Sequence, residues 1–374
     1  MLKVAIVGCG KIADEHASQV QRIKGCEIVA VCDTEPLMAR QFWERFPVKR
    51  HFSDLRELLS NAKPDVVHVT TPPASHFENA KLCLEAGCHV YVEKPFALSE
   101  EEARTLIAVA NNRSLKITAG HDDQFRHAAR SMRALVHKGY LGGPPVHVES
   151  YYCYELSDPG YAKVVLGDKR HWVRRLPGKL LQNVISHGIA RIAEFLINDS
   201  PEIIAHGFVS PFLKSIGESE IIDELRVIIH EEQGLTAYFT FSSQMRPSLH
   251  QFRLYGPRNG IILDQDQETI IKLPGKRLKS YADKFVPPVQ VAGQYLGSLT
   301  RNVGAFLRND FHMKSGMKYL IESFYNSILD GAEVPIPYCE ILLTARIMDK
   351  IFAQLDLQQR LKQRQTDLET VPVN

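Results

Sequence analysis

The first third of the chain alternates short apolar runs with longer amphipathic segments. Continuous β-forming residues, such as those at 2–7, are typical of strands that are buried on both faces of a sheet. The pattern predicts strands at 2–7, 26–32, 65–70, 89–92 and 115–120, and helices at 11–22, 36–46, 54–62, 75–87 and 101–112. Ser53 and Ser99 are expected to cap the helices that follow them, and Glu102 completes a capping box with Ser99. This order predicts a Rossmann-type, doubly wound parallel sheet with helices on both faces.

The pattern changes after residue 122. A helix is predicted from Phe125 to Lys138, and extended stretches follow at 146–154, 203–210, 221–230, 235–242 and 251–264. Consecutive strands of this kind indicate an open, mostly antiparallel sheet. In the stretch LTAYFTF, residues Leu235, Ala237, Phe239 and Phe241 alternate with more polar ones, which gives the strand one apolar face.

Two domains are therefore predicted. Residues 1–122 would form a dinucleotide-binding Rossmann domain (α/β), and residues 123–374 an α+β domain for substrate binding and oligomerisation. The polar tail after about residue 358 is expected to fray.

Composition and charge narrow the function classes. The formal charge of the 374 residues is only +2, which gives no electrostatic case for binding nucleic acid. The apolar runs are far shorter than a membrane-spanning helix requires, so no membrane association is expected. Seven cysteines without CxxC or metal-type spacing indicate reduced thiols in a soluble, cytoplasmic protein, and no metal site is predicted.

The turn after the first strand carries a dinucleotide fingerprint. Gly8-Cys9-Gly10-Lys11-Ile12-Ala13 fits the pattern GxGxxG/A, in which the first glycine permits a tight turn and the second lets the backbone approach a pyrophosphate. Asp33 follows Ala13 by twenty residues, at the end of the second strand. A carboxylate there suits the ribose hydroxyls of NAD and repels the additional phosphate of NADP. The cofactor is therefore predicted to be NAD rather than NADP.

Several longer stretches resemble the Gfo/Idh/MocA family of NAD(P)-dependent sugar and cyclitol oxidoreductases. They are VAIVGCGKIADEH at 4–16, VVHVTTPPASHFENAKLCLEAGCHVYVEKPFAL at 66–98, AGHDDQFRHAARSMRALVHKGYLGGPPVHVESYY at 119–152, KLLQNVISHGIARI at 179–192 and SFYNSILDGAEVPIPYCE at 323–340. The most specific of them is the tripeptide Glu93-Lys94-Pro95 after the fifth strand.

Lys94 stands at the carboxyl end of a predicted parallel strand, where open α/β sheets bind their ligands. The resemblance implies that Lys94 lies beside the nicotinamide ring and the reacting carbon, on a turn that Pro95 fixes and that Glu93 begins. A lysine in that position is partly desolvated, and it could donate hydrogen bonds to a developing alkoxide or relay a proton. A solvent-exposed lysine at the end of a strand is the alternative.

The resemblance places His187 at the family's catalytic histidine, whose neutral imidazole takes the hydroxyl proton as hydride leaves. Asn183 lies four residues earlier on the same predicted helix, which starts near Gln182. Many family members carry aspartate at that position. Asparagine can orient a substrate hydroxyl but cannot stabilise an imidazolium by charge, so loss of the anion should lower the pKa of the histidine.

Other residues are weaker candidates. Thr70, Thr71 and Pro72 are expected to line the cofactor's ribose–nicotinamide portion, with a plain strand-to-helix turn as the alternative. His76 matches a family position near that loop, and a surface position at the start of a helix would explain it equally well. His121, Gln124, Trp172 and Arg174 are candidates for substrate contact, although packing or surface roles would explain them equally well. Tyr151, Tyr152 and Tyr154 are expected to pack within the sheet.

Together these features predict an NAD(H)-dependent oxidoreductase acting on a secondary hydroxyl or ketone of a sugar, cyclitol or nucleotide sugar. The rivals are an NAD-dependent glycosidase that oxidises its substrate transiently before elimination, and a non-catalytic NAD-binding regulator. A homo-oligomer, dimer or tetramer, is expected through the C-terminal sheet, as is common in the family.

Overall fold

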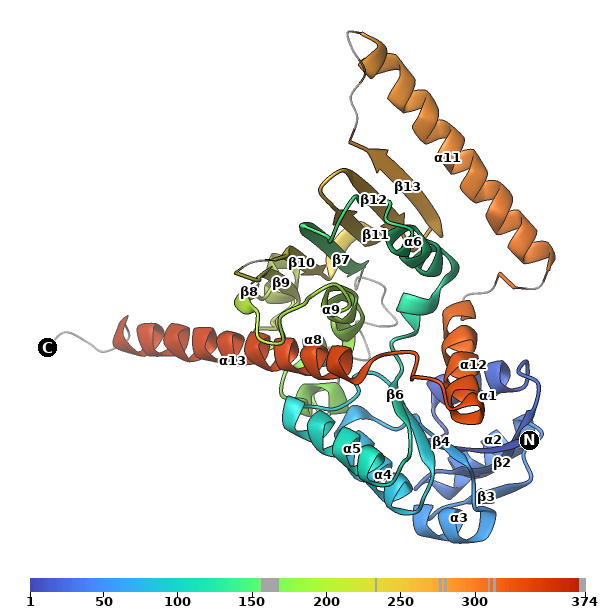
Figure 1. Ribbon diagram of the computed structural model, residues 1–374. Helices are drawn as coiled ribbons and strands as arrows, with labels where there is room; N and C mark the ends of the chain where they lie inside the picture. Colours follow the sequence, from blue (N-terminus) through green and yellow to red (C-terminus); the bar gives the residue numbers. More distant parts are fainter. Residues whose placement is uncertain are drawn as a thin grey trace, which may run out of the picture.

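A computed structural model describes residues 1–155, 168–232, 234–275, 278, 281–308, 310–311 and 314–369. Within these residues the chain builds two sheets, each with its own hydrophobic core (Figure 1). None of the helices in this part of the chain combines the length and the apolar character that are needed to cross a bilayer.

The N-terminal sheet is parallel throughout, as predicted, and its strand order is β3-β2-β1-β4-β5-β6. Its strands are β1 (Leu2–Val7), β2 (Cys26–Cys32), β3 (Arg50–Phe52), β4 (Val66–Val69), β5 (His89–Val92) and β6 (Ile117–Ala119). The helices between them are α1 (Lys11–Val20), α2 (Pro36–Arg45), α3 (Leu55–Ala62), α4 (His76–Glu85) and α5 (Glu100–Asn112). The sequence pattern missed β3, because this edge strand is short and partly exposed.

Two helix starts in this domain differ from the prediction. Asp54, not Ser53, caps α3, and its carboxylate accepts a hydrogen bond of 2.9 Å from the Glu57 N–H. Ser99 caps α5 as expected. The Glu102 carboxylate, however, accepts from the N–H of Leu98, one residue before the cap, instead of from that of Ser99.

The second sheet is mixed, with the order β13-β12-β11-β7-β10-β9-β8 and a single parallel pair, β7 with β10, among the described strands. Its strands are β7 (His147–Glu155), β8 (Glu202–Phe208), β9 (Glu224–His230), β10 (Thr236–Ser242), β11 (Gln244–Tyr255), β12 (Asn259–Asp264) and β13 (Thr269–Pro274). The mostly antiparallel sheet is thus confirmed. The stretch 251–264 is two strands, not one, because the Gly256 N–H bonds back to the Asn259 carbonyl in a tight turn. β13 was missed.

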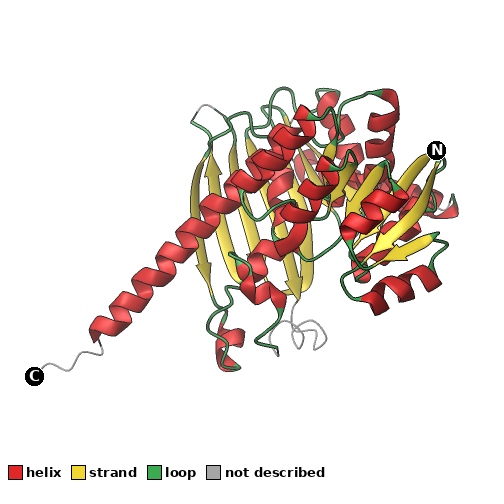
Figure 2. Ribbon diagram, turned by 90° about the horizontal axis from the view of Figure 1, so that it is seen from below, coloured by secondary structure: helices red, strands yellow, loops and turns green. Residues whose placement is uncertain are grey.

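One face of this sheet is covered by helices. Ala237, Phe239 and Phe241 are fully buried there, which confirms the predicted alternation in β10. The helices of this domain are α6 (His127–His137), α8 (Lys179–Val184), α9 (Ser186–Ala193), α10 (Pro211–Ser215) and α13 (Tyr338–Glu369), and α13 runs across the sheet in Figure 2.

The long helix α13 protects the β8 edge of the sheet. Gln354 and Gln358 pair with the backbone of Ile203, Ala205 and Gly207 through their side-chain amides. This pairing satisfies edge groups that would otherwise be open to another strand. The helix continues to Glu369, beyond the point at about residue 358 where the polar tail begins, and the fraying of that tail stays a prediction.

Two further helices connect the domains. The helix α11 (Ala282–Leu307) lies along β13, and Gln294 hydrogen-bonds both backbone groups of Lys272 on that strand (Figure 1). The helix α12 (Ser315–Asp330) then returns to the N-terminal domain, where Leu320, Phe324 and Tyr325 belong to its core. The first domain therefore draws part of its core from residues far beyond 122.

Candidate active site

The glycine loop lies where the order of the parallel strands reverses, between β1 and β4. Gly8 has a φ of +93°, and a Cβ at this position would lie 2.8 Å from the backbone nitrogen of Thr71. Thr70 closes the contact, because its hydroxyl donates to the Gly8 carbonyl at 2.7 Å. The Asp33 carboxylate accepts from the Cys9 N–H at 2.7 Å, and so holds the loop at the end of β2.

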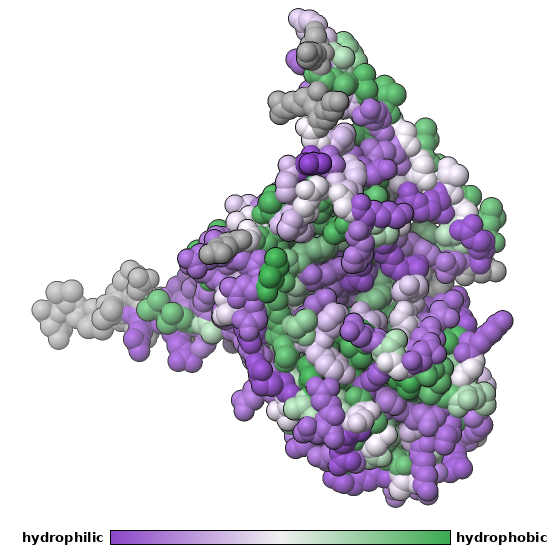
Figure 3. Space-filling view, viewed as in Figure 1, coloured by the Kyte–Doolittle hydropathy of each residue, from purple (hydrophilic) through white to green (hydrophobic). Residues whose placement is uncertain are grey.

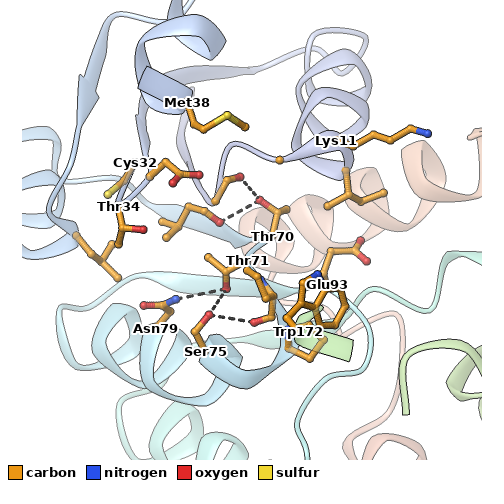
Figure 4. Close-up of a pocket in the computed structure, with 18 of the residues that line it drawn as sticks. Lys11, Cys32, Thr34, Met38, Thr70, Thr71, Ser75, Asn79, Glu93 and Trp172 are labelled. Atoms are coloured by element: carbon orange, nitrogen blue, oxygen red, sulfur yellow. Dashed lines mark hydrogen bonds between the residues drawn. The ribbon is translucent and has the colours of Figure 1, made fainter. Parts of the chain in front are cut away.

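A cavity of about 910 Å³ opens over this loop. Its volume falls within the range of cofactor and small-molecule sites. Figure 4 shows Thr34 and Met38 on one side and Ser75, Asn79 and Trp172 on the other. Most of the predicted cofactor residues line it: Gly8, Gly10, Lys11, Ile12, Asp33, Thr70, Thr71, Pro72, Glu93 and Lys94. The glycine cradle and the acidic group at the end of β2 are the features that an NAD molecule would need here.

Ala13, His76 and Pro95 are not among the described residues that line this cavity. Ala13 is fully buried in α1. His76 joins two loops of the site, since its Nδ1 and Nε2 each lie 2.8 Å from a backbone carbonyl oxygen, of Pro95 and Thr71 respectively. It thus holds the turn after β5 against the loop after β4.

Lys94 stands two residues after the end of β5, lines the cavity and precedes a cis peptide bond to Pro95. Its Nζ donates a 3.0 Å hydrogen bond to the backbone carbonyl of Asn183, which belongs to the second domain. Burial lowers the pKa of Lys94, whereas the Glu93, Asp122 and Asp123 carboxylates act in the opposite direction. The lysine is therefore held at the domain boundary beside several anions.

The helix predicted from Gln182 onward is two short helices, α8 and α9, which meet at Ile185. Asn183 lines the cavity, and His187 lies one turn further along, with 8 % of its surface exposed. Burial lowers the pKa of His187 to about 4; the Asp123 carboxylate opposes this effect and Lys94 adds to it. The imidazole is thus neutral at neutral pH and can accept a proton.

Two carboxylates that the sequence analysis did not single out flank His187. Asp123 Oδ2 lies 3.7 Å from its Nδ1, and Asp122 Oδ1 lies 3.9 Å from its Nε2. Both aspartates stand just after β6, in the 3₁₀ turn η2 (Asp122–Phe125). The anion that Asn183 cannot supply is therefore provided by another element. Their position at the carboxyl end of a parallel strand was the available signal.

The two aspartates are pushed toward different protonation states. Burial and the neighbouring Asp123 charge raise the pKa of Asp122 to about 7. Burial would also raise the pKa of Asp123, but the charges of His187 and Arg191 and a 2.9 Å hydrogen bond from the Tyr152 hydroxyl hold it low. Tyr152, which was expected only to pack in the sheet, thus orients a group that faces His187.

The four candidates for substrate contact lie in different surroundings. The His121 ring lies 5.9 Å from that of His187, between centroids, and neither of its buried nitrogens has a hydrogen-bond partner in the structure. Burial lowers the pKa of His121 to about 3. Trp172, in η3 (Trp172–Arg175), lines the cavity. Arg174 pairs with Glu218 at 2.6 Å, and Gln124 hydrogen-bonds Glu194 and the carbonyl of Ala190. The partners seen for those two residues are protein groups.

Asp122, Asp123 and His187 also form a possible cation site among the described residues, since one ligand atom from each lies within 4.8 Å of the others. They come from segments far apart in the sequence, so ligand spacing could not have revealed them. The absence of a metal stays a prediction.

Residues 2–121 match the family model described as "Oxidoreductase family, NAD-binding Rossmann fold". The N-terminal domain thus carries the NAD-binding Rossmann fold of the Gfo/Idh/MocA oxidoreductase family. A curated relative, the D-glucoside 3-dehydrogenase of Escherichia coli, is 36 % identical over 142 residues, which are 38 % of this chain and 40 % of that enzyme. The chain thus aligns with about two fifths of the length of this relative.

Two other proteins match this chain over a longer span. The myo-inositol 2-dehydrogenase of Thermotoga maritima is 21 % identical over 84 % of this chain and 89 % of its own. The crystal structure of the WlbA dehydrogenase from Bordetella pertussis, in complex with NADH and UDP-GlcNAcA, has a TM-score of 0.74, with 14 % identity and 94 % of each chain covered. At that identity the structural match supports the two-domain fold alone.

Proposed function

We propose that this protein is an NAD(H)-dependent oxidoreductase that transfers hydride between nicotinamide and a secondary hydroxyl or ketone of a sugar, cyclitol or nucleotide sugar. The observation that carries the proposal is that Lys94 and Asn183, from different domains, line one cavity, with His187 one turn after Asn183. Lys94 reaches across to the carbonyl of Asn183, one turn before His187. The names of the relatives, which include glucoside, inositol and nucleotide-sugar dehydrogenases, support the substrate class.

The side chains suit the oxidation of an alcohol. Bound NAD supplies an acceptor for the hydride. His187, neutral and buried, takes the hydroxyl proton, and Asp122 and Asp123 stabilise the imidazolium that results. Lys94 donates to the substrate oxygen as negative charge develops on it. Asn183 lines the cavity and His121 lies beside His187, so that both can orient other hydroxyls of the substrate.

A screen of substrates tests the proposal. Sugars, cyclitols and nucleotide sugars are incubated with NAD and NADP in parallel, and the absorbance of the reduced cofactor is followed. We expect net reduction with at least one compound and a preference for NAD, because Asp33 lines the cavity at the end of β2. A clear preference for NADP would contradict the role of Asp33. Release of a sugar leaving group without net formation of NADH would favour the NAD-dependent glycosidase. Binding of NAD without any turnover would favour the non-catalytic regulator.

The pH dependence of alcohol oxidation is predicted to report Asp122. Because its pKa is raised to about 7 while that of His187 is lowered to about 4, a fall of kcat/KM below neutral pH should follow protonation of Asp122. The protonated acid no longer stabilises the imidazolium. Asp122→Asn should be less active and flat between pH 5 and 8. In Asp123→Asn the fall of activity at acid pH should remain but move to lower pH, because the loss of the neighbouring anion lowers the pKa of Asp122. If Asp122→Asn kept the same fall of activity at acid pH, a group other than Asp122 would be responsible for it.

We also propose that the protein is a homo-oligomer and resides in the cytoplasm. The sheet face away from the helices exposes Ile204, Ile228 and Tyr238 by 44–56 %. The helix α11, which lies along β13 at the other edge of this sheet, exposes Phe285, Leu296 and Phe306 by 65–70 %, and Figure 3 shows apolar side chains along that edge of the molecule. Apolar surface of this extent is typical of subunit interfaces.

The proposed location in the cytoplasm rests on the cysteines. All seven are free, as in a reducing compartment.

The expected mass in solution is a multiple of the 42.3 kDa chain. Light scattering coupled to gel filtration would measure it. Ile228→Asp with Tyr238→Asp should yield smaller species, because charges would be buried in the interface. As a control, Arg40→Asp lies on an exposed helix of the N-terminal domain and should change nothing. A wild-type chain that elutes as a monomer at all concentrations would refute the proposal.

A further inference from the structure

Behind the cavity, a chain of hydrogen bonds crosses the interior of the N-terminal domain. His16 of α1 places its Nε2 2.9 Å from Glu93 Oε1 and its Nδ1 2.7 Å from the Nδ1 of His68 on β4. The Nε2 of His68 lies 2.8 Å from the hydroxyl of Tyr325, on α12. Both histidines are fully buried, and Tyr325 is 1 % exposed. The ring of Tyr91 stacks on His68.

The position of every proton along these hydrogen bonds follows from the groups at the two ends of the series, Glu93 and Tyr325. A carboxylate only accepts, so the Nε2 of His16 must donate to Glu93. In a neutral ring the Nδ1 of His16 then accepts, and the Nδ1 of His68 must donate to it. The Nε2 of His68 is therefore the acceptor, and the Tyr325 hydroxyl donates. All donors point toward Glu93, and each buried polar group is paired, as the interior of a protein requires.

A doubly protonated His16 would fit less well. Its Nδ1 would donate to His68, whose Nε2 would then donate to the Tyr325 oxygen. The phenolic proton would be left to find another acceptor, and among the described residues His68 is the one hydrogen-bond partner of that hydroxyl. An unpaired buried donor costs free energy, so the neutral chain is favoured.

Glu93 is the point at which this chain meets the active site. It lines the cavity next to Lys94, and its other oxygen accepts from the Lys94 N–H at 3.1 Å. Burial would raise the pKa of Glu93, but the hydrogen bond from His16 and the positive charges that His16, Lys94 and His187 carry when protonated hold it down at about 2. Lys94 itself faces the Glu93, Asp122 and Asp123 carboxylates, the cation of Lys314 and the Asn183 carbonyl.

We propose that Tyr325, His68 and His16 are positioning residues of the active site, which hold Glu93 as a carboxylate against a neutral imidazole and thereby keep Lys94 in its ammonium form. This inference rests on the proposed oxidoreductase function for the role of Lys94, but not for the proton positions. The series of hydrogen bonds connects Tyr325 on α12 to Glu93, the residue next to Lys94.

The proton positions are tested by long-range ¹H–¹⁵N NMR spectra of the ¹⁵N-labelled full chain between pH 6 and 9, with His16 and His68 assigned from His16→Gln and His68→Gln variants. We expect His16 to be neutral with its proton on Nε2, and His68 to be neutral with its proton on Nδ1. A doubly protonated His16, or a His68 protonated on Nε2, would overturn the proposal. This measurement needs no activity, so it stands even if the proposed function fails.

The consequence for Lys94 is tested with Tyr325→Phe and the pH profile of kcat/KM on the best substrate. Without the phenolic hydroxyl, the proton of His68 is no longer fixed on Nδ1. When that proton lies on Nε2, His16 takes a second proton to keep both of its contacts. The added positive charge disfavours the ammonium of Lys94, so the alkaline limb should move to lower pH by about one unit. Tyr319→Phe, on the exposed side of the same helix, is the matched control and should superimpose on wild type.

A purely structural role for Tyr325 would give a different result. It would lower the melting temperature or reduce kcat/KM equally at every pH, with the alkaline limb unmoved, and that outcome would overturn the proposal. Melting curves and the NAD dissociation constant, measured on the same samples, show that the comparison is between folded, cofactor-binding proteins.

Discussion

Replacing either Lys94 or His187 with alanine is expected to lower turnover by roughly 10²-fold or more, the usual range for a positioned acid–base group. The two side chains act at one site from different domains, since Lys94 contacts the carbonyl of Asn183 one turn before His187. Removing Lys94 takes away the donor to the developing alkoxide. Removing His187 takes away the proton acceptor that burial keeps neutral.

The measurement is steady-state and single-turnover kinetics with the best substrate, together with NAD binding by calorimetry. Both variants should bind NAD within a few-fold of wild type. Lys11→Ala is a matched control, because Lys11 lines the same cavity beside the glycine loop at the start of α1. It should weaken NAD binding and spare the rate of the hydride-transfer step. Near-normal rates in both Lys94→Ala and His187→Ala would remove the mechanism proposed here.

Gly8→Ala is expected to destabilise the N-terminal domain by about 2–4 kcal/mol, through overpacking and backbone strain. Its φ is +93°, and a Cβ would lie 2.8–2.9 Å from backbone atoms of Thr70 and Thr71, which cannot move without breaking the contact between the β1 and β4 loops. The same clash would distort the loop that holds the cofactor phosphates, so NAD affinity should also fall.

Gly10→Ala provides the matched comparison. A Cβ there meets nothing within 4 Å in the protein, and the residue has a negative φ. Its stability should therefore match wild type, while NAD binding weakens because the backbone can no longer approach a pyrophosphate. Urea denaturation and calorimetry separate the two effects. If both variants lost the same stability, the close contact between Gly8 and the Thr70–Thr71 backbone would not be the cause of the loss.

Local chemistry explains why much of this site was predictable. Strand-length apolar runs, the glycine loop, Asp33 and the Glu93-Lys94-Pro95 turn are contiguous features, and a parallel sheet brings the carboxyl ends of its strands to one edge. The sequence could thus indicate that the glycine loop, Thr70 and Lys94 would share a cavity, and they do. The apolar face of β10 was equally evident, because alternation with a period of two needs no tertiary information.

Long-range packing decided the rest. The anion beside His187 could not be located from Asn183, since Asp122 and Asp123 come from another strand end and reach the histidine only through the docking of the two domains. The pairing of His16 with His68 and Tyr325 joins residues up to 309 positions apart, and it exists because α12 returns to the first domain. Arg174, a candidate for substrate contact, pairs with Glu218, and the sequence could not indicate this partner 44 residues away. By itself the sequence determined most elements of the first domain, the cofactor loop and the identity of the lysine and the histidine, because those depend on neighbours in the chain. Only the tertiary structure decided which charges surround them, because burial and distance between remote segments set the pKa values on which their chemistry depends.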